Sequence, residues 1–132
     1  MQTKQFYAMI LACLIVAGCG GQGFVPAGGK VAFDDGTPLE GGGITFQTET
    51  FMAQGEIRSD GTFTLSSLKP GDGLPPGTYK VVIGWSDYDA NERIVHHVDP
   101  IFADPMTTTL TAEVVKGGKG QNQFEFVVTK PR

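Results

Sequence analysis

The residues best suited to bind a ligand gather in one polar stretch, between residues 86 and 105. They are carboxylate, imidazole and phenol side chains: Asp87, Tyr88, Asp89, His96 and His97. Carboxylates and imidazoles are common ligands of divalent cations, and an exposed tyrosine ring can stack on a sugar. The residue types of this stretch therefore suggest two kinds of ligand, a metal ion and a glycan.

Residues 87–98 can be compared with the ligand pattern of a calcium-binding loop. Asp87, Asp89 and Asn91 alternate as the first three ligands of such a loop do. The sixth position, however, is Glu92 where the loop needs glycine, and the twelfth is Val98 where it needs a bidentate glutamate. We therefore predict a solvated polar loop with no metal or cofactor, and keep calcium in a looser geometry as the alternative.

The spacing of the histidines argues against a shared metal ion, and the spacing of the aromatic residues indicates which of them is exposed. His96 and His97 are adjacent, so on a strand they point to opposite faces and cannot both bind one ion. Tyr79 and Trp85 share the alternation of the apolar strand that precedes the loop, which favours core packing. Tyr88 lies beyond that strand, so it is the better candidate for an exposed contact with a glycan or a protein.

The N-terminus has the pattern of a secretory signal peptide. Lys4 precedes a run of apolar residues, 6–17, and small residues follow before a glycine-rich break. The apolar run is shorter than the roughly 20 residues that a membrane-spanning helix needs. We therefore predict a cleaved leader over residues 1–18.

The residues at the break resemble the bacterial lipobox. Val16, Ala17 and Gly18 stand where the lipoprotein signal peptidase recognises its substrate, directly before Cys19. The resemblance implies a diacylglyceryl thioether on Cys19 and an acyl group, such as palmitate, on its new amine. Two or three acyl chains suffice for stable anchoring in a membrane.

Processing of this kind would leave no free thiol. Cleavage would remove Cys13 and the lipid would occupy Cys19, so the mature chain would have neither a disulfide nor a cysteine nucleophile. We predict that residues 19–28, which are rich in glycine, form a flexible tether. The formal net charge is −4 and the basic residues do not cluster, which argues against a nucleic-acid partner.

The remainder, residues 29–132, reads as a β-domain. Short runs with a two-residue alternation of apolar side chains are separated by turns rich in glycine, proline and aspartate. The pattern predicts seven strands, at 29–33, 44–47, 53–58, 63–66, 78–86, 109–115 and 123–129. It also allows a short strand at 94–98 and indicates an Asp60-Gly61 hairpin with a primed turn. We predict an all-β, two-sheet sandwich.

Several motifs resemble those of a known family. They are the stretches at 29–31, 37–41, 44–46, 59–63 and 76–81. Together they are similar to carboxypeptidase-regulatory-like domains, which are transthyretin-like, immunoglobulin-like β-sandwiches. Behind a lipobox, the whole arrangement looks like the small lipoproteins of planctomycete-type bacteria.

The resemblance implies a non-catalytic envelope protein. We expect a structural or protein-interaction role, with the membrane and another envelope protein or a glycan as partners. Gly20 stands where an aspartate often marks inner-membrane retention, so the outer membrane is favoured. A glycan- or calcium-binding module is the alternative. A transthyretin-like hydrolase is weaker, because the chain ends Thr129-Lys130-Pro131-Arg132, without that enzyme's C-terminal signature, and contains no arrangement of catalytic residues.

Overall fold

The computed structural model describes residues 23–117 and 122–132. The expected leader (1–18) and the lipobox residues Val16, Ala17, Gly18 and Cys19 lie outside the described residues. Within the described ranges, no helix is long and apolar enough to cross a membrane.

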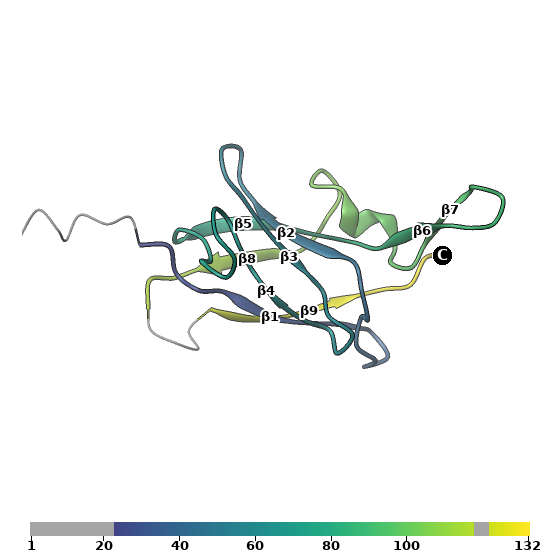
Figure 1. Ribbon diagram of the computed structural model, residues 1–132, viewed down its shortest axis with the longest axis horizontal. Helices are drawn as coiled ribbons and strands as arrows, with labels where there is room; N and C mark the ends of the chain where they lie inside the picture. The colour runs from purple at the N-terminus through teal and green to yellow at the C-terminus, as the bar shows by residue number, and fades with distance from the viewer. Residues whose placement is uncertain (1–22, 118–121) are drawn as a thin grey trace, which may run out of the picture.

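The fold is all-β, as the alternation predicts, with two main sheets (Figure 1). One sheet has the strand order β4-β1-β9 and the other has β3-β2-β5-β8. β1 pairs antiparallel with β4 and parallel with β9, whereas the pairs of the second sheet are antiparallel. Their bounds are β1 Gly28–Phe33, β2 Gly43–Gln47, β3 Met52–Glu56, β4 Thr62–Thr64, β5 Gly77–Gly84, β8 Thr111–Val114 and β9 Gln123–Val128.

Three further elements lie in the region between β5 and β8. β6 (Ser86–Tyr88) and β7 (Ile94–His96) form a separate two-stranded antiparallel sheet. A short 3-10 helix, η2 (Pro100–Ala103), follows and buries Phe102 against the body. The sequence pattern places Ser86 in the fifth strand, but the chain leaves the main sheet after Gly84 and starts a new one.

The two main sheets are joined along one edge by the hairpin of β3 and β4. The backbone amides of Gln54 and Ser66 each donate to the other's carbonyl oxygen, at 3.0 and 2.8 Å. At the opposite edge, the buried side chain of Asn122 accepts from the Val115 amide and donates to the Val115 carbonyl, at 2.9 and 2.8 Å. Backbone groups at both edges are thereby paired, which keeps the sheets in register.

The β3–β4 hairpin is present where predicted, but its turn is of another type. The Gly61 amide donates to the Arg58 carbonyl, and the Arg58 amide donates to the Thr62 carbonyl. Gly61 has a φ of 87°, whereas Asp60 has no positive φ, as a primed turn would require. The loop is therefore a three-residue turn closed by a glycine bulge. The prediction was wrong because Asp-Gly occurs in both turn types, and the length of the loop decides between them.

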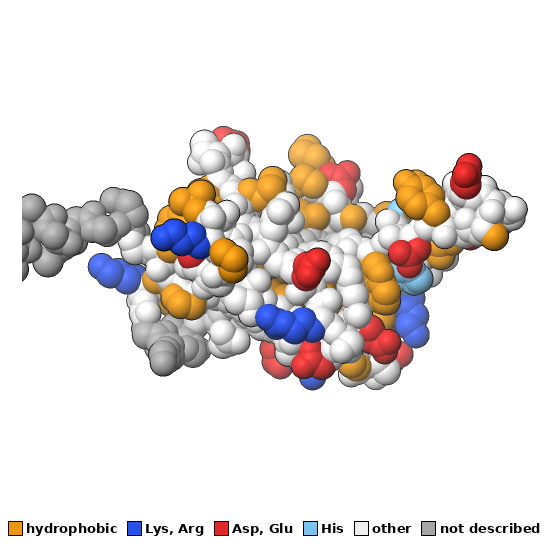
Figure 2. All heavy atoms as spheres, viewed as in Figure 1, with side chains coloured by type: hydrophobic (Ala, Val, Ile, Leu, Met, Phe, Trp, Pro, Cys, Tyr) orange, Lys and Arg blue, Asp and Glu red, His pale blue; other side chains and the backbone are white. Residues whose placement is uncertain are grey.

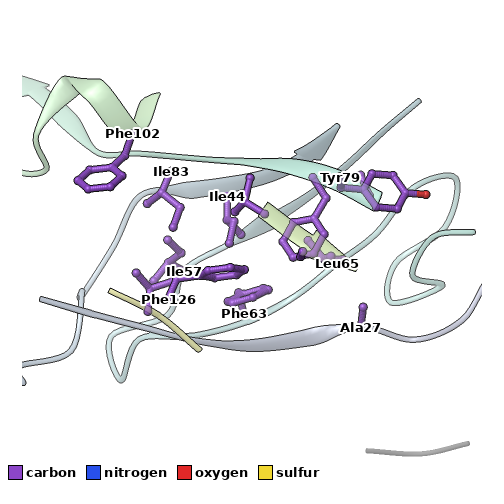
Figure 3. Packing of buried hydrophobic residues seen from close by; sticks show 14 of the residues in the cluster. Ala27, Ile44, Ile57, Phe63, Leu65, Tyr79, Ile83, Phe102 and Phe126 are labelled. Atoms are coloured by element: carbon purple, nitrogen blue, oxygen red, sulfur yellow. The ribbon is translucent and has the colours of Figure 1, made fainter. Parts of the chain in front are cut away.

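The core is apolar and rich in aromatic rings. Phe46 of β2 is fully buried, and its ring centroid lies 5.5–6.3 Å from those of Phe63, Tyr79, Phe124 and Phe126. Figure 3 shows side chains from both sheets pointing into the space between them. Tyr79 takes the core position predicted for it, and its hydroxyl donates to the Pro75 carbonyl at 2.6 Å. Burial raises the pKa of this phenol.

The end of the expected tether is part of the body. The glycine-rich sequence predicts a flexible linker over residues 19–28, but Val25 and Ala27 are buried and Gly28 opens β1. Val25 also exchanges backbone hydrogen bonds with Leu74, at 2.9 and 3.1 Å. Glycine-rich composition suggested a linker, yet the apolar residues among the glycines are held by contacts distant in sequence.

Phe46→Ala should destabilise the sandwich strongly, because it leaves a cavity at the point where rings from both sheets meet. We expect the free energy of unfolding to fall by about 3–5 kcal/mol, measured by denaturant titration. Val127→Ala, at an exposed position of β9, is the control and should change it by less than about 0.5 kcal/mol. Equal effects would contradict the central role of Phe46.

Candidate functional site: a projecting hairpin

The β6–β7 hairpin, residues 86–96, projects from one end of the sandwich (Figure 1). Its two strands pair only with each other, and every residue in them is exposed. An isolated two-stranded hairpin in water is marginally stable at best. The contacts at its tip and its base therefore decide how well it is ordered.

The hairpin carries apolar side chains in contact with solvent. Tyr88 is 74% exposed, Ile94 58% and Val95 40%. Tyr88 and Ile94 are directly opposite each other in the pairing, so they share a face, whereas Val95 is opposite Asp87 on the other face. Exposed aromatic and branched side chains on a protruding element are typical of a protein-binding surface.

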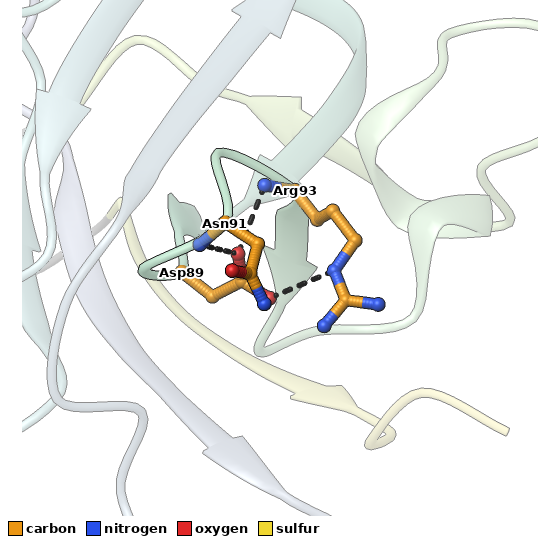
Figure 4. A network of polar contacts seen from close by, with 3 residues as sticks. All are labelled: Asp89, Asn91 and Arg93. Atoms are coloured by element: carbon orange, nitrogen blue, oxygen red, sulfur yellow. Dashed lines mark hydrogen bonds and ion pairs between the residues drawn. The ribbon is translucent and has the colours of Figure 1, made fainter.

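Asp89 closes the tip of the hairpin (Figure 4). One oxygen of its carboxylate accepts from the backbone amides of Asn91 and Arg93, at 2.8 and 3.0 Å, and the other accepts from the Arg93 guanidinium at 3.2 Å. The Arg93 amide, opposed by slight burial, is the main reason that the pKa of Asp89 lies below its ordinary value. The carboxylate that the sequence offers as a calcium ligand is thus engaged in holding the loop.

Glu92 is the strained residue of this tip. The Glu92 amide donates to the Asp89 carbonyl, and the Asp89 amide donates to the Arg93 carbonyl, the same pattern as around Gly61. Glu92 has a φ of 61°, in the position that Gly61 occupies in its loop, and no other non-glycine residue of the described chain has a positive φ. A left-handed conformation costs a non-glycine residue roughly 1–2 kcal/mol.

The base of the hairpin is held by His97. Its Nε2 lies 2.8 Å from a carboxylate oxygen of Asp87, and its ring centroid lies 4.3 Å from that of Trp85 at an interplanar angle of 34°. The His97 amide also donates to the Trp85 carbonyl at 2.8 Å. One face of the Trp85 indole is therefore covered by the imidazole.

The glycine run 41–43 lies beside Trp85 and makes room for the indole. A Cβ on Gly42 would lie 2.6 Å from the Trp85 Cβ, and a Cβ on Gly41 would lie 3.0 Å from the indole ring. Gly42 also has a φ of 97°. Any larger residue there would move Trp85 and, with it, the base of the hairpin.

A hollow of about 520 Å³ opens beside this base. Its lining is Phe33, Thr37, Pro38, Glu40, Trp85, His96, His97, Lys130 and Pro131. Lys130 Nζ lies 5.4 Å from the Phe33 ring centroid and 3.5 Å from the Asp35 carboxylate, so its charge is partly engaged. The hollow combines apolar rings with a carboxylate, an ammonium and imidazoles, which suits a polar or charged side chain of a partner.

A second hollow, of about 900 Å³, lies on the outer side of β3 and β4. Its polar lining includes Thr45, Gln54, Glu56, Thr64 and Arg58, whose guanidinium donates to the hydroxyls of Thr62 and Thr64. None of the candidate ligand residues Asp87, Tyr88, Asp89, His96 and His97 lines it. We therefore place the candidate site at the hairpin.

The structure brings together only some of the residues that the sequence singles out. Asp87 and His97 form a pair, His96 and His97 line the same hollow, and Tyr88 is exposed as expected. Asp89 lies at the tip of the hairpin, in the loop of Figure 4. Within the described residues, no group of three or more His, Cys, Asp or Glu side chains could hold a metal ion.

The alternation of the strand favours core packing for Trp85 and gives no sign of its contact with His97. Trp85 is half-buried and packs against the core on one side while contacting the imidazole on another. The alternation also gives no sign of Glu40 and Lys130, which reach the hollow from segments far apart in the chain. The glycine run 41–43 was the available signal, since such runs mark places where another group approaches the backbone closely.

Comparisons with known proteins do not identify a family. No family model matches the chain, and no curated protein matches it. Among solved structures, a 9R-lipoxygenase from Cyanothece PCC8801 aligns with a TM-score of 0.34 and 16% sequence identity. The alignment covers 84% of this chain and 18% of that one, so the chain spans less than a fifth of the lipoxygenase's length. A similarity of this size carries no functional argument.

Glu92→Gly should stabilise the tip of the hairpin, because glycine adopts the left-handed conformation without a steric cost. A gain of about 1 kcal/mol corresponds to roughly fivefold slower amide hydrogen exchange at Asp89 and Arg93. Ala90→Gly, in the same loop at an ordinary φ, is the matched control and should give no gain. Unchanged exchange in Glu92→Gly would show that the tip is not strained.

Proposed function

We propose that this chain is a lipid-anchored cell-envelope protein whose β-sandwich holds the β6–β7 hairpin out to a protein partner. The role is structural or interactional and involves no catalysis. The observation that carries the proposal is the hairpin itself, where Tyr88, Ile94 and Val95 are exposed on an element that the body does not cover.

The anchoring half of the proposal rests on the N-terminal sequence. Val16, Ala17 and Gly18 precede Cys19 as a lipobox does, and Lys4 and the apolar run precede them. Acyl chains on Cys19 would hold the protein on an envelope membrane, and Gly20 favours the outer one.

The finer classification of the fold is part of the same proposal. We assign the sandwich to the transthyretin-like, carboxypeptidase-regulatory-like class. The motifs at 59–63 and 76–81 support it, and so do main sheets of three and four strands.

A protein partner is favoured over a glycan or calcium. The exposed Tyr88 ring has the branched aliphatic side chain of Ile94 opposite it, which favours an apolar protein contact over glycan stacking, and one face of the Trp85 indole is covered by the imidazole of His97. Calcium binding at the hairpin is opposed by the Asp89 carboxylate, which is engaged with the loop amides and Arg93.

The anchor is tested by intact mass and detergent phase partitioning of the protein purified from bacterial membranes. We expect Cys19 to be the N-terminal residue, to carry acyl chains, and to bring the protein into the detergent phase. Cys13→Ala is the matched control and should behave as the unaltered protein does, whereas Cys19→Ala should lose the lipid. A bare Cys19 in an aqueous protein would contradict the anchor.

The partner is tested by site-specific photocrosslinking in the envelope. A photoreactive phenylalanine analogue in place of Tyr88 should yield one dominant adduct, because that side chain is 74% exposed. The same analogue at Val127, also exposed but on β9, is the control and should not give this adduct.

Ile94→Asp should remove the adduct, since it places a charge on the face that Tyr88 shares. The adduct should also be recovered when the identified partner is tagged instead. An adduct that persists in Ile94→Asp, or none at all from position 88, would contradict a hairpin interface.

A further inference from the structure

The described chain begins at the end of the sandwich opposite the hairpin (Figure 1). Gly23 is the first described residue, and Val25 pairs with Leu74 immediately after it. The loop that leads into Leu74 therefore lies beside the point where the chain reaches the body. This loop comprises residues 65–73.

The length of chain between Cys19 and Gly23 sets a limit on distance. A fully extended chain spans at most about 3.6 Å per residue, so the four Cα-to-Cα steps from residue 19 to residue 23 cover no more than about 14 Å. With acyl chains on Cys19, which is the proposed function on which this step rests, the Gly23 end cannot leave the vicinity of the lipid headgroups.

Leu68 is the apolar group that this end offers to the lipid. Its side chain is 82% exposed, although hydrogen bonds hold the backbone of the loop around it. The Asp72 carboxylate accepts from the amides of Ser67, Leu68 and Lys69, at 2.7, 3.0 and 3.0 Å. Leu68 is thereby held outward by the loop's own hydrogen bonds, in advance of any contact.

Asp72 is well suited to this holding role at neutral pH. Burial raises the pKa of its carboxyl, but the amides of Ser67, Lys69 and Leu68 outweigh that effect, and the pKa lies below its ordinary value. The carboxylate therefore stays ionised, and its charge is turned toward the loop amides.

Each end of the molecule carries charged side chains of both signs. Lys69 and Lys116 are exposed near the chain's entry point, where the acidic residues Glu49, Asp72 and Glu113 also lie. The loops and the hairpin at the opposite end carry Asp34, Asp35, Asp60, Asp87, Asp89 and Glu92, of which Asp35 is paired with Lys130 and Asp89 with Arg93. In Figure 2 most of the red side chains lie away from the end where the described chain begins. An anionic lipid surface can contact the exposed ammonium groups of Lys69 and Lys116 directly.

We propose that the protein stands on the lipid surface with the 65–73 loop against the headgroups, Leu68 inserted among them and Lys69 and Lys116 beside it. The occupant of this surface is the anchoring membrane itself. The hairpin is consequently held at the far end, turned away from the lipid and accessible to a partner.

The test compares two tryptophan substitutions in the lipidated full protein. Leu68→Trp and Tyr88→Trp each replace an exposed apolar residue, at opposite ends of the molecule, and the native Trp85 supplies the same background in both. The proteins are reconstituted in vesicles of phosphatidylethanolamine and phosphatidylglycerol with brominated acyl chains, which quench nearby indoles.

We expect the emission added at position 68 to fall about twofold or more relative to vesicles without bromine, because an inserted side chain reaches the headgroup–acyl boundary. The emission added at position 88 should not change. If a lipidated Leu68→Trp protein is unquenched, or if both positions are quenched alike, this orientation is overturned while the anchor stands. If intact mass shows no lipid on Cys19, the anchor fails and the orientation fails with it.

Discussion

The sandwich depends on the contact between the two sheets at Phe46. This ring comes from β2, in one sheet, and meets Phe63 of β4 and Phe124 and Phe126 of β9, in the other. Tilted and edge-on arrangements at these distances are favourable for aromatic pairs beyond the area that they bury. Because both cysteines of the chain lie outside the described residues, the described body is held by such packing and by backbone hydrogen bonds.

Hydrogen bonds along the edges of the two sheets add to this packing and hold the sheets together. Gln54 and Ser66 join the sheets on one side, and the buried amide of Asn122 joins the ends of β8 and β9 on the other. Every buried polar side-chain atom of the described residues has a hydrogen-bond partner. The body of the sandwich is therefore well satisfied in hydrogen bonds. The β6–β7 hairpin projects from this body.

The two ends of the molecule are chemically different. The end where the chain enters has a bonded loop with an exposed leucine, whereas the far end has acidic loops, a strained tip and exposed aromatic and branched side chains. The strain at Glu92 persists because Asp89 and Arg93 determine the loop around it. Strained residues of this kind are often found at binding sites, where a defined shape matters more than local stability.

The sequence by itself determined the all-β class, the positions of most strands and the residues that face the core. Alternation carries this information, because a strand buries every second side chain whatever its partners are. It also determined that Tyr88 is exposed, since that residue lies beyond the apolar run. The tertiary structure alone decided which strands are neighbours, that Val25 and Ala27 belong to the body, and that His97 and Asp87 meet beside Trp85. Those outcomes depend on contacts between segments distant in the chain, and a local pattern of residue types carries no information about which distant segment will be there.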